Sequence, residues 1–383
     1  MSDSESQPMS EDRRKVSHEL ITLWIPHCTD EEISQYQAAH CVDATRFWVV
    51  LIGINVYPSS PLRGCVSDVE KMEEFLTKDL VVPEGRIQRL LSPIPIPSPD
   101  PSDTSKHIDP EQRPVATPTR KNIIDTLLDL STKPEILPGD NIIIYFSGHG
   151  SSYDLKASGL YEEDDISAVG PIEALCPVDR TASATNISIP DISNREINTI
   201  LAEISRAKGN HITLILDCCH SSGASREPNE PLNVVRRAPS LLATSIKDML
   251  DAAHTRLEIL PNYRSVLKGD WKPDMTSHVV LAACTETQHA KEAEGAGNCC
   301  NRIFTQALIG ALKSDGLKEE PTYVDLITIS ASMIPPNAKQ TPMVAGDMYA
   351  QRLWYQPDIL AVPDLDLAPV TTPTPAPTPQ PEV

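Results

Sequence analysis

The stretch HITLILDCCHSSGASR, residues 211–226, places thiol and imidazole groups at the end of an apolar run. Cys218, Cys219 and His220 could form a metal site, a redox pair, a packed strand end or the nucleophilic centre of an enzyme. A zinc site favours CxxC or HxxxH spacing and a redox pair favours CxxC, and this stretch has neither spacing. A packed strand end and a nucleophile are the two interpretations that remain.

A second apolar run, NIIIYF at residues 141–146, leads into Ser147, Gly148, His149 and Gly150. Runs without polar alternation are typical of parallel strands covered on both faces, and the carboxyl ends of such strands share the edge where ligands bind. If the two strands are neighbours, His149 and a cysteine reach the same crevice. A thiolate can then attack, and an imidazole can lower the pKa of the thiol and protonate the leaving amine.

The position of each group in its strand end favours one cysteine and one histidine. Cys218 is nearer the strand body and is expected to pack inward, whereas Cys219 is freer to reach the edge. His220 is adjacent to the nucleophile and should project elsewhere. His149 lies between glycines that allow a substrate backbone to approach, so it is the better base.

The elements around these runs alternate between strands and helices. Strands are expected at 47–55, 86–91 and 277–284, and helices at 67–76, 119–130, 196–204, 302–313 and 322–333. Ser67 and Glu70 form a capping-box pattern for the first of these helices. The alternation predicts an α/β fold with a mostly parallel central sheet and helices on both faces.

Composition limits the class of protein and its partners. The chain has 383 residues, 40% of them apolar, and its nine cysteines show no disulfide framework. The N-terminus lacks the apolar core of a signal peptide, and no apolar run reaches roughly 18 residues. We therefore expect a soluble cytoplasmic protein. A net charge of −20 disfavours nucleic acid and anionic membrane as partners.

Several motifs together resemble the caspase-like cysteine peptidases, specifically the metacaspases and their fungal members. SGHG (147–150) and DCCHS (217–221) resemble the two catalytic motifs of the family. VLIGINVY (50–57), LRGCVSDVEKMEEFL (62–76), CPVD (176–179) and the 277–356 segment with KQTPMVAGD match the rest in the family's order. The resemblance implies a caspase-like fold over residues 46–356, with a large-subunit-like part at 46–222, a linker at 223–275 and a small-subunit-like part at 276–356. Residues 1–45 are then a polar prosegment, 93–118 a proline-rich insertion and 357–383 a disordered proline-rich tail.

Carried over by position, the resemblance makes Cys219 the nucleophile and His149 the general acid and base. The backbone N–H groups of Gly150 and Cys219 would form the oxyanion hole. Asp68 and Asp217 would line the S1 pocket, and such a pair of carboxylates favours arginine or lysine at P1. The positions also have ordinary explanations, since Asp68 suits the first turn of a helix and Asp217 could cap a turn. Arg63 suggests the alternative of aspartate specificity, but two acids would repel an acidic P1 residue.

Three positions depart from the family pattern. Ser222 stands where a glycine usually follows the nucleophile motif. The family's calcium site uses acids in the loop after the histidine, where Asp164 and Asp165 are weak candidates, together with an Asp-Asp pair that here reads Asn194-Arg195. The Arg195 guanidinium would repel a cation, so calcium binding is doubtful and no cofactor is expected to be required.

The resulting hypothesis is a cysteine endopeptidase that cleaves protein or peptide substrates after Arg or Lys and acts as a monomer. Self-cleavage in the basic segment 223–275, at Arg236-Arg237 or at Lys268, is a second hypothesis. The competing interpretation is a catalytically silent regulatory or interaction protein on the same fold. The sequence leaves open the natural substrates, the activating signal and the biological process, with apoptosis-like cell death, stress response and protein quality control as options.

Overall fold

Six strands form the central sheet of the computed structural model, with strand order β11-β8-β7-β3-β1-β2. All neighbours pair in parallel except β11, which is antiparallel to β8. The strands are β1 (Phe47–Gly53), β2 (Ile87–Leu91), β3 (Asn141–Ser147), β7 (Ile212–Asp217), β8 (Val279–Ala282) and β11 (Met343–Ala345). The predicted α/β fold with a mostly parallel sheet is confirmed.

The structure describes residues 42–58, 60–92, 115–155, 171–181, 188–218, 238, 240–241, 245–284, 292–294, 300–314, 321–338 and 340–354. Val42–Tyr355 forms one compact unit. The expected prosegment up to residue 41, the expected tail and most of the proline-rich insertion lie outside the described residues. The two ends of that insertion meet at the sheet edge, where the Leu91 N–H donates to the Ala116 carbonyl at 3.0 Å.

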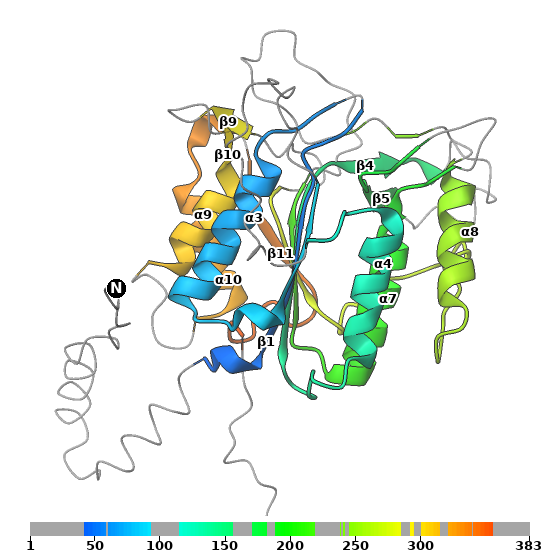
Figure 1. Cartoon of the computed structure of the whole chain (residues 1–383), viewed down its shortest axis with the longest axis horizontal. Helices are drawn as coiled ribbons and strands as arrows, with labels where there is room; N and C mark the ends of the chain where they lie inside the picture. Colours follow the sequence, from blue (N-terminus) through cyan, green and yellow to red (C-terminus); the bar gives the residue numbers. More distant parts are fainter. Residues whose placement is uncertain are drawn as a thin grey trace, which may run out of the picture. The chain divides into compact units, whose positions relative to one another are not determined.

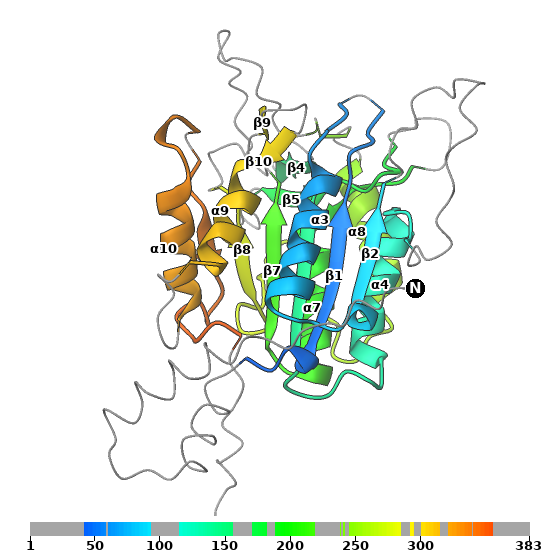
Figure 2. The same cartoon turned by 60° about the vertical axis from the view of Figure 1, so that its left-hand side comes forward.

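Helices cover both faces of the sheet (Figures 1 and 2). One face carries α3 (Cys65–Glu74), continued by the π-helical turn η2 (Phe75–Asp79), with α9 (Ile303–Leu312) and α10 (Tyr323–Met333). The other face carries α4 (Arg120–Thr132) and α7 (Asn194–Lys208), with α8 (Ser245–Leu257) outside α7. Short 3-10 turns complete the described helices: η1 (Ala44–Arg46), η3 (Glu84–Arg86) and η4 (Pro336–Ala338).

Alternate residues of each strand supply two hydrophobic cores. In β1, Phe47, Val49 and Leu51 pack with the α3 face, whereas Trp48, Val50 and Ile52 pack with the α4 face. Successive side chains of a strand point to opposite faces, so the uninterrupted apolar runs follow directly from double coverage.

Two smaller sheets lie beyond the central one. The first is antiparallel, with order β4-β5-β6, and consists of β4 (Gly150–Tyr153), β5 (Ile172–Leu175) and β6 (Ile192–Ser193). The second pairs β9 (Glu292–Glu294) with β10 (Cys300–Arg302). Because β4 begins only three residues after β3 ends, the first of these sheets holds the loop that contains His149.

The predicted start of the first helix is wrong. The α3 helix begins at Cys65 after Gly64 and has no side-chain cap from its own first turn, so the Ser67–Glu70 capping box does not form. Instead the Asn55 side-chain oxygen accepts from the Cys65 N–H at 2.8 Å and from the Val66 N–H at 3.3 Å. A residue ten positions earlier therefore satisfies the helix terminus, which a local pattern could not reveal.

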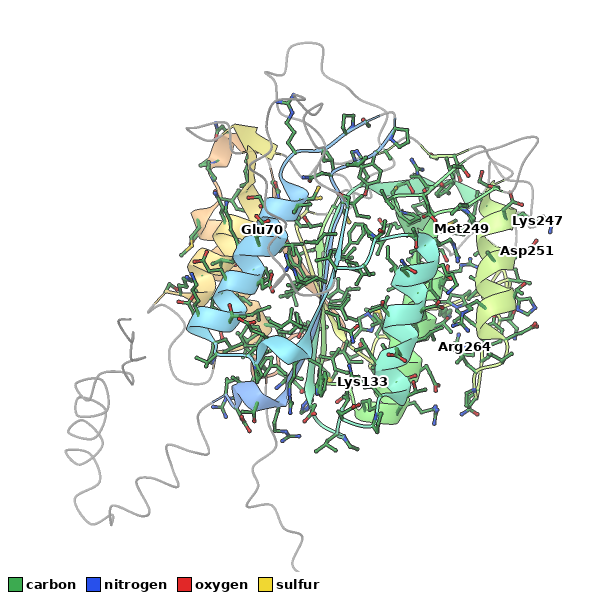
Figure 3. All side chains as sticks on the ribbon, viewed as in Figure 1. Glu70, Lys133, Lys247, Met249, Asp251 and Arg264 are labelled. Atoms are coloured by element: carbon green, nitrogen blue, oxygen red, sulfur yellow. The ribbon has the colours of Figure 1, made fainter. Side chains whose placement is uncertain are left out.

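The segment 223–275, expected to be a linker, contains the helix α8. Its apolar side is buried and includes Met249, which Figure 3 shows on the side toward the body of the molecule. Lys247 and Asp251 form an ion pair on the outer side of the same helix (Figure 3). The spacing of Ile246, Met249, Leu250, Ala253 and Leu257 was the available sequence signal.

Candidate active site

The strands that carry the two reactive motifs are direct neighbours. β3 pairs with β7 in parallel, and the register places Ser147 opposite Asp217 at the carboxyl end. His149 follows Ser147 by two residues, and Cys219 follows Asp217 by two. The expected neighbourhood of the two strands is confirmed, although Cys219 and His220 lie outside the described residues.

Cys218 packs into the core, as predicted. It is 2% exposed and belongs to the hydrophobic cluster on the α4 face. Its carbonyl lies 3.9 Å from the sulfur of Cys284, at the end of the neighbouring strand β8. Cys218 is thus a packed strand-end residue, which leaves Cys219 as the candidate nucleophile of the pair.

His149 is fully buried just after the end of β3, and its ring contacts the main chain between β1 and α3. Nε2 lies 2.7 Å from the Ser60 carbonyl oxygen. A carbonyl only accepts hydrogen bonds, so Nε2 carries the proton in this contact. In a neutral ring Nδ1 is then the nitrogen that can take up a proton, as a general base requires.

Tyr57 is a functional candidate that the sequence patterns did not single out. Its hydroxyl accepts from the His149 N–H at 3.0 Å and donates to the Cys176 carbonyl at 3.0 Å. Its ring centroid lies 4.5 Å from that of the His149 ring, at an interplanar angle of 54°. Burial raises the pKa of Tyr57 well above its usual range, so the phenol keeps the proton that it donates.

Gly148 is required by the close approach of Tyr57. A Cβ at this position would lie 2.7 Å from the Tyr57 hydroxyl and 2.7 Å from the Phe146 ring. No ordinary side-chain contact is that short, so the glycine allows Tyr57 to reach the backbone of the next residue.

The sheet that begins with Gly150 is held by a buried carboxylate, Asp191. Ser151 and Tyr153 each donate to its Oδ2 at 2.7 Å. Arg180 donates to both of its oxygens at 2.7 and 2.8 Å. The bidentate pair ties the 176–180 loop to the start of β6, and the two hydroxyl donors tie β4 to the same carboxylate.

The two acids expected in the S1 pocket, Asp68 and Asp217, are both buried. Asp68 is 0% exposed on α3, and Asp217 is 1% exposed at the end of β7. Asp217 accepts from the Thr305 hydroxyl of α9 at 2.6 Å, which places its carboxylate on the α3 and α9 face of the sheet. Ser147, opposite Asp217, donates to the Cys65 carbonyl at the start of α3 at 3.1 Å. Both acids therefore belong to the same face of the sheet and to its carboxyl end.

Of the positions that correspond to the family's calcium site, the structure describes Asn194 and Arg195. Asp164 and Asp165 lie outside the described residues. Arg195, in the position of the paired acids, is 1% exposed and lies over the Trp271 ring at 5.4 Å. Its Nη1 donates to the Val266 carbonyl at 2.7 Å. Within the described part of the chain, no group of three or more His, Cys, Asp or Glu residues could hold a metal ion.

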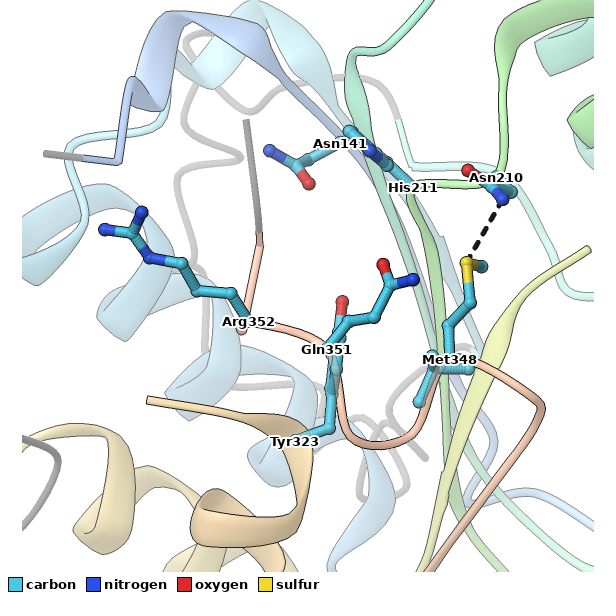
Figure 4. A pocket seen from close by; sticks show the side chains of 8 residues that line it. Asn141, Asn210, His211, Tyr323, Met348, Gln351 and Arg352 are labelled. Carbon is cyan, nitrogen blue, oxygen red and sulfur yellow. Dashed lines mark hydrogen bonds between the residues drawn. The ribbon is translucent and has the colours of Figure 1, made fainter. Parts of the chain in front are cut away.

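Two hollows of the described structure lie away from His149. Figure 4 shows a small one at the amino ends of β3 and β7, where Asn210 donates to the Met348 sulfur at 3.1 Å. A larger one, of about 570 Å³, lies between α4, α8 and residues 188–190. Neither hollow is lined by His149, Asp68 or Asp217.

The fold and the paired strand ends agree with the comparisons. The family model of the caspase domain, peptidase family C14, matches residues 46–353. The chain therefore belongs to the caspase-domain peptidase family, and its resemblance to this family is confirmed.

The similar proteins are metacaspases. Metacaspase-1A of Aspergillus niger is 24% identical over 334 residues, which span 81% of this chain and 72% of that protein. Metacaspase-1 of Eremothecium gossypii is 31% identical over 192 residues, or 50% of this chain and 34% of that protein. Metacaspase-8 of Arabidopsis thaliana is 30% identical over 200 residues, or 50% of this chain and 41% of that protein. The chain thus spans less than half the length of the last two relatives.

A solved structure supports the fold alone. The crystal structure of protein GSU0716 from Geobacter sulfurreducens covers 81% of this chain and 98% of its own, with a TM-score of 0.51 and 18% identity. Separately, none of the helices in the described residues has the length and apolar character needed to cross a membrane.

Proposed function

We propose that this protein is a cysteine endopeptidase of the metacaspase type that cleaves peptide bonds after arginine or lysine. The observation that carries the proposal is the pairing of Ser147 with Asp217 on adjacent parallel strands. Two residues beyond this pair stand His149 and Cys219, so both strands lead toward the same edge of the sheet. The family membership supports the same assignment.

In the proposed reaction, His149 takes the proton of the Cys219 thiol, and the thiolate attacks the carbonyl carbon of the P1 residue and forms a C–S bond. His149 gives this proton to the departing amine as the C–N bond breaks. Water then adds to the acyl-enzyme, the C–S bond breaks, and the thiol is restored. The backbone N–H groups of Gly150 and Cys219 would bind the oxyanion as its charge develops. Asp68 and Asp217 would bind the cationic P1 side chain.

Peptides with a fluorogenic leaving group test the proposal. We expect cleavage of peptides ending in Arg or Lys and no cleavage of Asp peptides by the purified full-length protein. The Cys219→Ala variant should have no activity. Preference for the Asp peptide, or activity that survives Cys219→Ala, would contradict the assignment.

The coverage of the site favours one competing function, a catalytically silent regulatory protein. His149 and Asp68 are 0% exposed and Asp217 is 1% exposed, so none of the three side chains is accessible to a substrate in this structure. An irreversible arginine-directed probe separates the two functions, because only a competent nucleophile is labelled. Labelling of the wild-type protein but not of Cys219→Ala would support the enzyme.

Calcium is not part of the proposed mechanism. The Arg195 guanidinium is held between the Val266 carbonyl and the Trp271 ring, which places a fixed positive charge where the family pattern has acids. Activity measured with added calcium and with a chelator should be equal. A strict need for calcium would contradict this part of the proposal.

Self-cleavage is best supported after Arg237. Ala238, the next residue, donates its N–H to the Gly150 carbonyl at 3.1 Å, and the Ser240 hydroxyl donates to the Ser152 carbonyl at 3.0 Å. These residues therefore follow the edge of β4 beside His149. Arg236 and Arg237 themselves lie outside the described residues. Intact masses of the wild-type and Cys219→Ala proteins test the proposal, since identical masses would exclude self-processing.

A further inference from the structure

A chain of three buried polar groups connects β3, α9 and β7 below the candidate site. The Tyr145 hydroxyl lies 2.6 Å from the Thr305 hydroxyl, which donates to Oδ2 of Asp217 at 2.6 Å. Tyr145 and Thr305 are 0% exposed. Tyr145 and Thr305 are 160 positions apart in the sequence, and Thr305 and Asp217 are 88 positions apart. Only the fold brings the three residues together.

The chemistry of these groups fixes the direction of the chain. A carboxylate only accepts hydrogen bonds, so the single hydroxyl proton of Thr305 points to Asp217. The Thr305 oxygen must then accept from Tyr145. Hydrogen bonds aligned in this way polarise one another, which strengthens the bond to the charged end.

The consequence concerns the orientation of Asp217. A hydroxyl donor at a fixed position holds one carboxylate oxygen and thus the plane of the carboxylate. A guanidinium needs a carboxylate in a set plane to form two parallel bonds, whereas an ammonium is a point charge with freely rotating donors. Fixing the plane therefore favours arginine over lysine.

We propose that Tyr145 and Thr305 act as positioning residues that hold the Asp217 carboxylate in the orientation required by an arginine side chain at P1. This inference rests on the proposed function, because it takes Asp217 as part of the S1 pocket. Neither hydroxyl touches the substrate or the reacting atoms. Their effect is on P1 selection and not on the chemical step.

A matched control exists on the same strand. Thr213, at the opposite end of β7, has its hydroxyl 2.8 Å from the hydroxyl of Tyr323 on α10. Thr213 is 1% exposed and Tyr323 is 6% exposed, and both lie on the same face as Asp217 and Thr305. This second pair has the same chemistry and similar burial but no carboxylate at its end. Loss of its hydroxyls costs packing and hydrogen bonding without affecting Asp217.

The experiment measures kcat and KM for Arg and Lys peptides with the full-length protein. Thr305→Val should raise KM for the Arg peptide roughly tenfold, the effect of losing one hydrogen bond to a charged group, with kcat nearly unchanged. Tyr145→Phe leaves the bond from Thr305 to Asp217 in place and removes only the bond that polarises it, so its KM should rise less. KM for the Lys peptide should rise less, so the ratio of kcat/KM for the Arg peptide to kcat/KM for the Lys peptide should fall. This ratio is the Arg-to-Lys preference. Thr305→Ser retains the hydroxyl and should restore most of the preference. Tyr323→Phe and Thr213→Val should leave the preference as in the wild type.

The inference would be overturned if Thr305→Val had the same Arg-to-Lys preference as the wild type. It would also be overturned if Tyr323→Phe and Thr213→Val lowered this preference as much as Thr305→Val does. If the wild type cleaves no Arg or Lys peptide, the proposed function fails, and a binding measurement decides the inference separately. Agmatine, which carries the guanidinium of an arginine side chain, is titrated calorimetrically into Cys219→Ala protein. Binding that weakens about tenfold with Thr305→Val supports the positioning role. Binding that is absent, or unchanged by Thr305→Val, overturns it.

Discussion

The guanidinium of Arg195 donates a 2.8 Å hydrogen bond to the backbone carbonyl of Lys268. The same nitrogen binds the Val266 carbonyl, so the main chain of this segment is tied to the buried start of α7. A peptidase must take the P1 carbonyl into its oxyanion hole, and this contact holds the Lys268 carbonyl elsewhere. Lys268 is thus a poor self-cleavage site although its side chain is exposed.

The first prediction follows from this contact and from the position of Ala238. Lys268→Ala should leave self-processing unchanged, whereas Arg237→Ala should abolish or strongly slow it. Mass spectrometry of the purified variants over time gives the fragment masses. A fragment ending at Lys268 in the wild type, with none ending at Arg237, would show that the assignment is wrong.

Removal of the Tyr57 hydroxyl should impair the chemical step. Tyr57→Phe keeps the ring beside His149 but loses the bonds to the His149 N–H and the Cys176 carbonyl. We expect kcat to fall about 10- to 100-fold with little change in KM, because a small displacement of a catalytic group has effects of this size.

The control for Tyr57→Phe is Tyr263→Phe. The Tyr263 hydroxyl also accepts a backbone N–H, that of Val266 at 3.1 Å, but it lies on the α8 side of the molecule. Its loss should leave kcat unchanged. If both variants lower kcat equally, the Tyr57 effect reflects general stability and the positioning role is excluded.

A methyl group at Gly148 should disrupt the site. The added Cβ would lie 2.7 Å from Tyr57 and Phe146, both of which are buried. Gly148→Ala should lower the free energy of unfolding by roughly 1–3 kcal/mol, as overpacking does, and should remove most of the peptidase activity.

Gly85→Ala is the matched control for Gly148→Ala, since no heavy atom lies within 4 Å of a Cβ at that position. Urea unfolding monitored by fluorescence and peptide cleavage should both match the wild type. Wild-type stability and activity in Gly148→Ala would show that the loop before His149 adapts to the methyl group.

Much of the fold could be predicted because its signals are local. β3 and β7 are continuous apolar runs, and the polar residues that follow them mark their carboxyl ends. Parallel topology then brings those ends together, as the pairing of Ser147 with Asp217 shows. Register and neighbourhood thus follow from hydrophobic pattern and from the general rules for α/β sheets.

The supporting residues could not be predicted, because their contacts are tertiary. Thr305 is one of two polar residues in the otherwise apolar helix α9, and nothing in its spacing relates it to Asp217. Tyr57 and Asn55 follow β1 in a segment that matches no helix, strand or capping pattern. Arg180 lies in a loop and donates to Asp191 eleven positions later. The role of each of these residues depends on a contact with a residue distant in the sequence. The hydrophobic periodicity of the sequence therefore does not indicate it.

The buried carboxyl group of Glu196 should give the protein a characteristic pH dependence. Burial raises the pKa of Glu196 to about 7, although the Arg120 guanidinium lies 2.6 Å away and favours the charged form. The folded state therefore binds a proton more tightly than the unfolded chain. The contribution of this group to stability is fully present below the unfolded pKa of about 4.5, falls as pH rises toward 7, and is constant above it.

Glu196→Gln keeps a neutral side chain of the same shape and should remove this dependence. The free energy of unfolding of the wild type, relative to Glu196→Gln, should fall by on the order of 2–3 kcal/mol between pH 4.5 and pH 8. Urea unfolding at several pH values measures the difference, with the same exchange at the exposed Glu70 (Figure 3) as the control. If the wild type and Glu196→Gln have parallel profiles, the Arg120 charge compensates the burial of Glu196, and the carboxylate is ionised in the folded protein throughout this range.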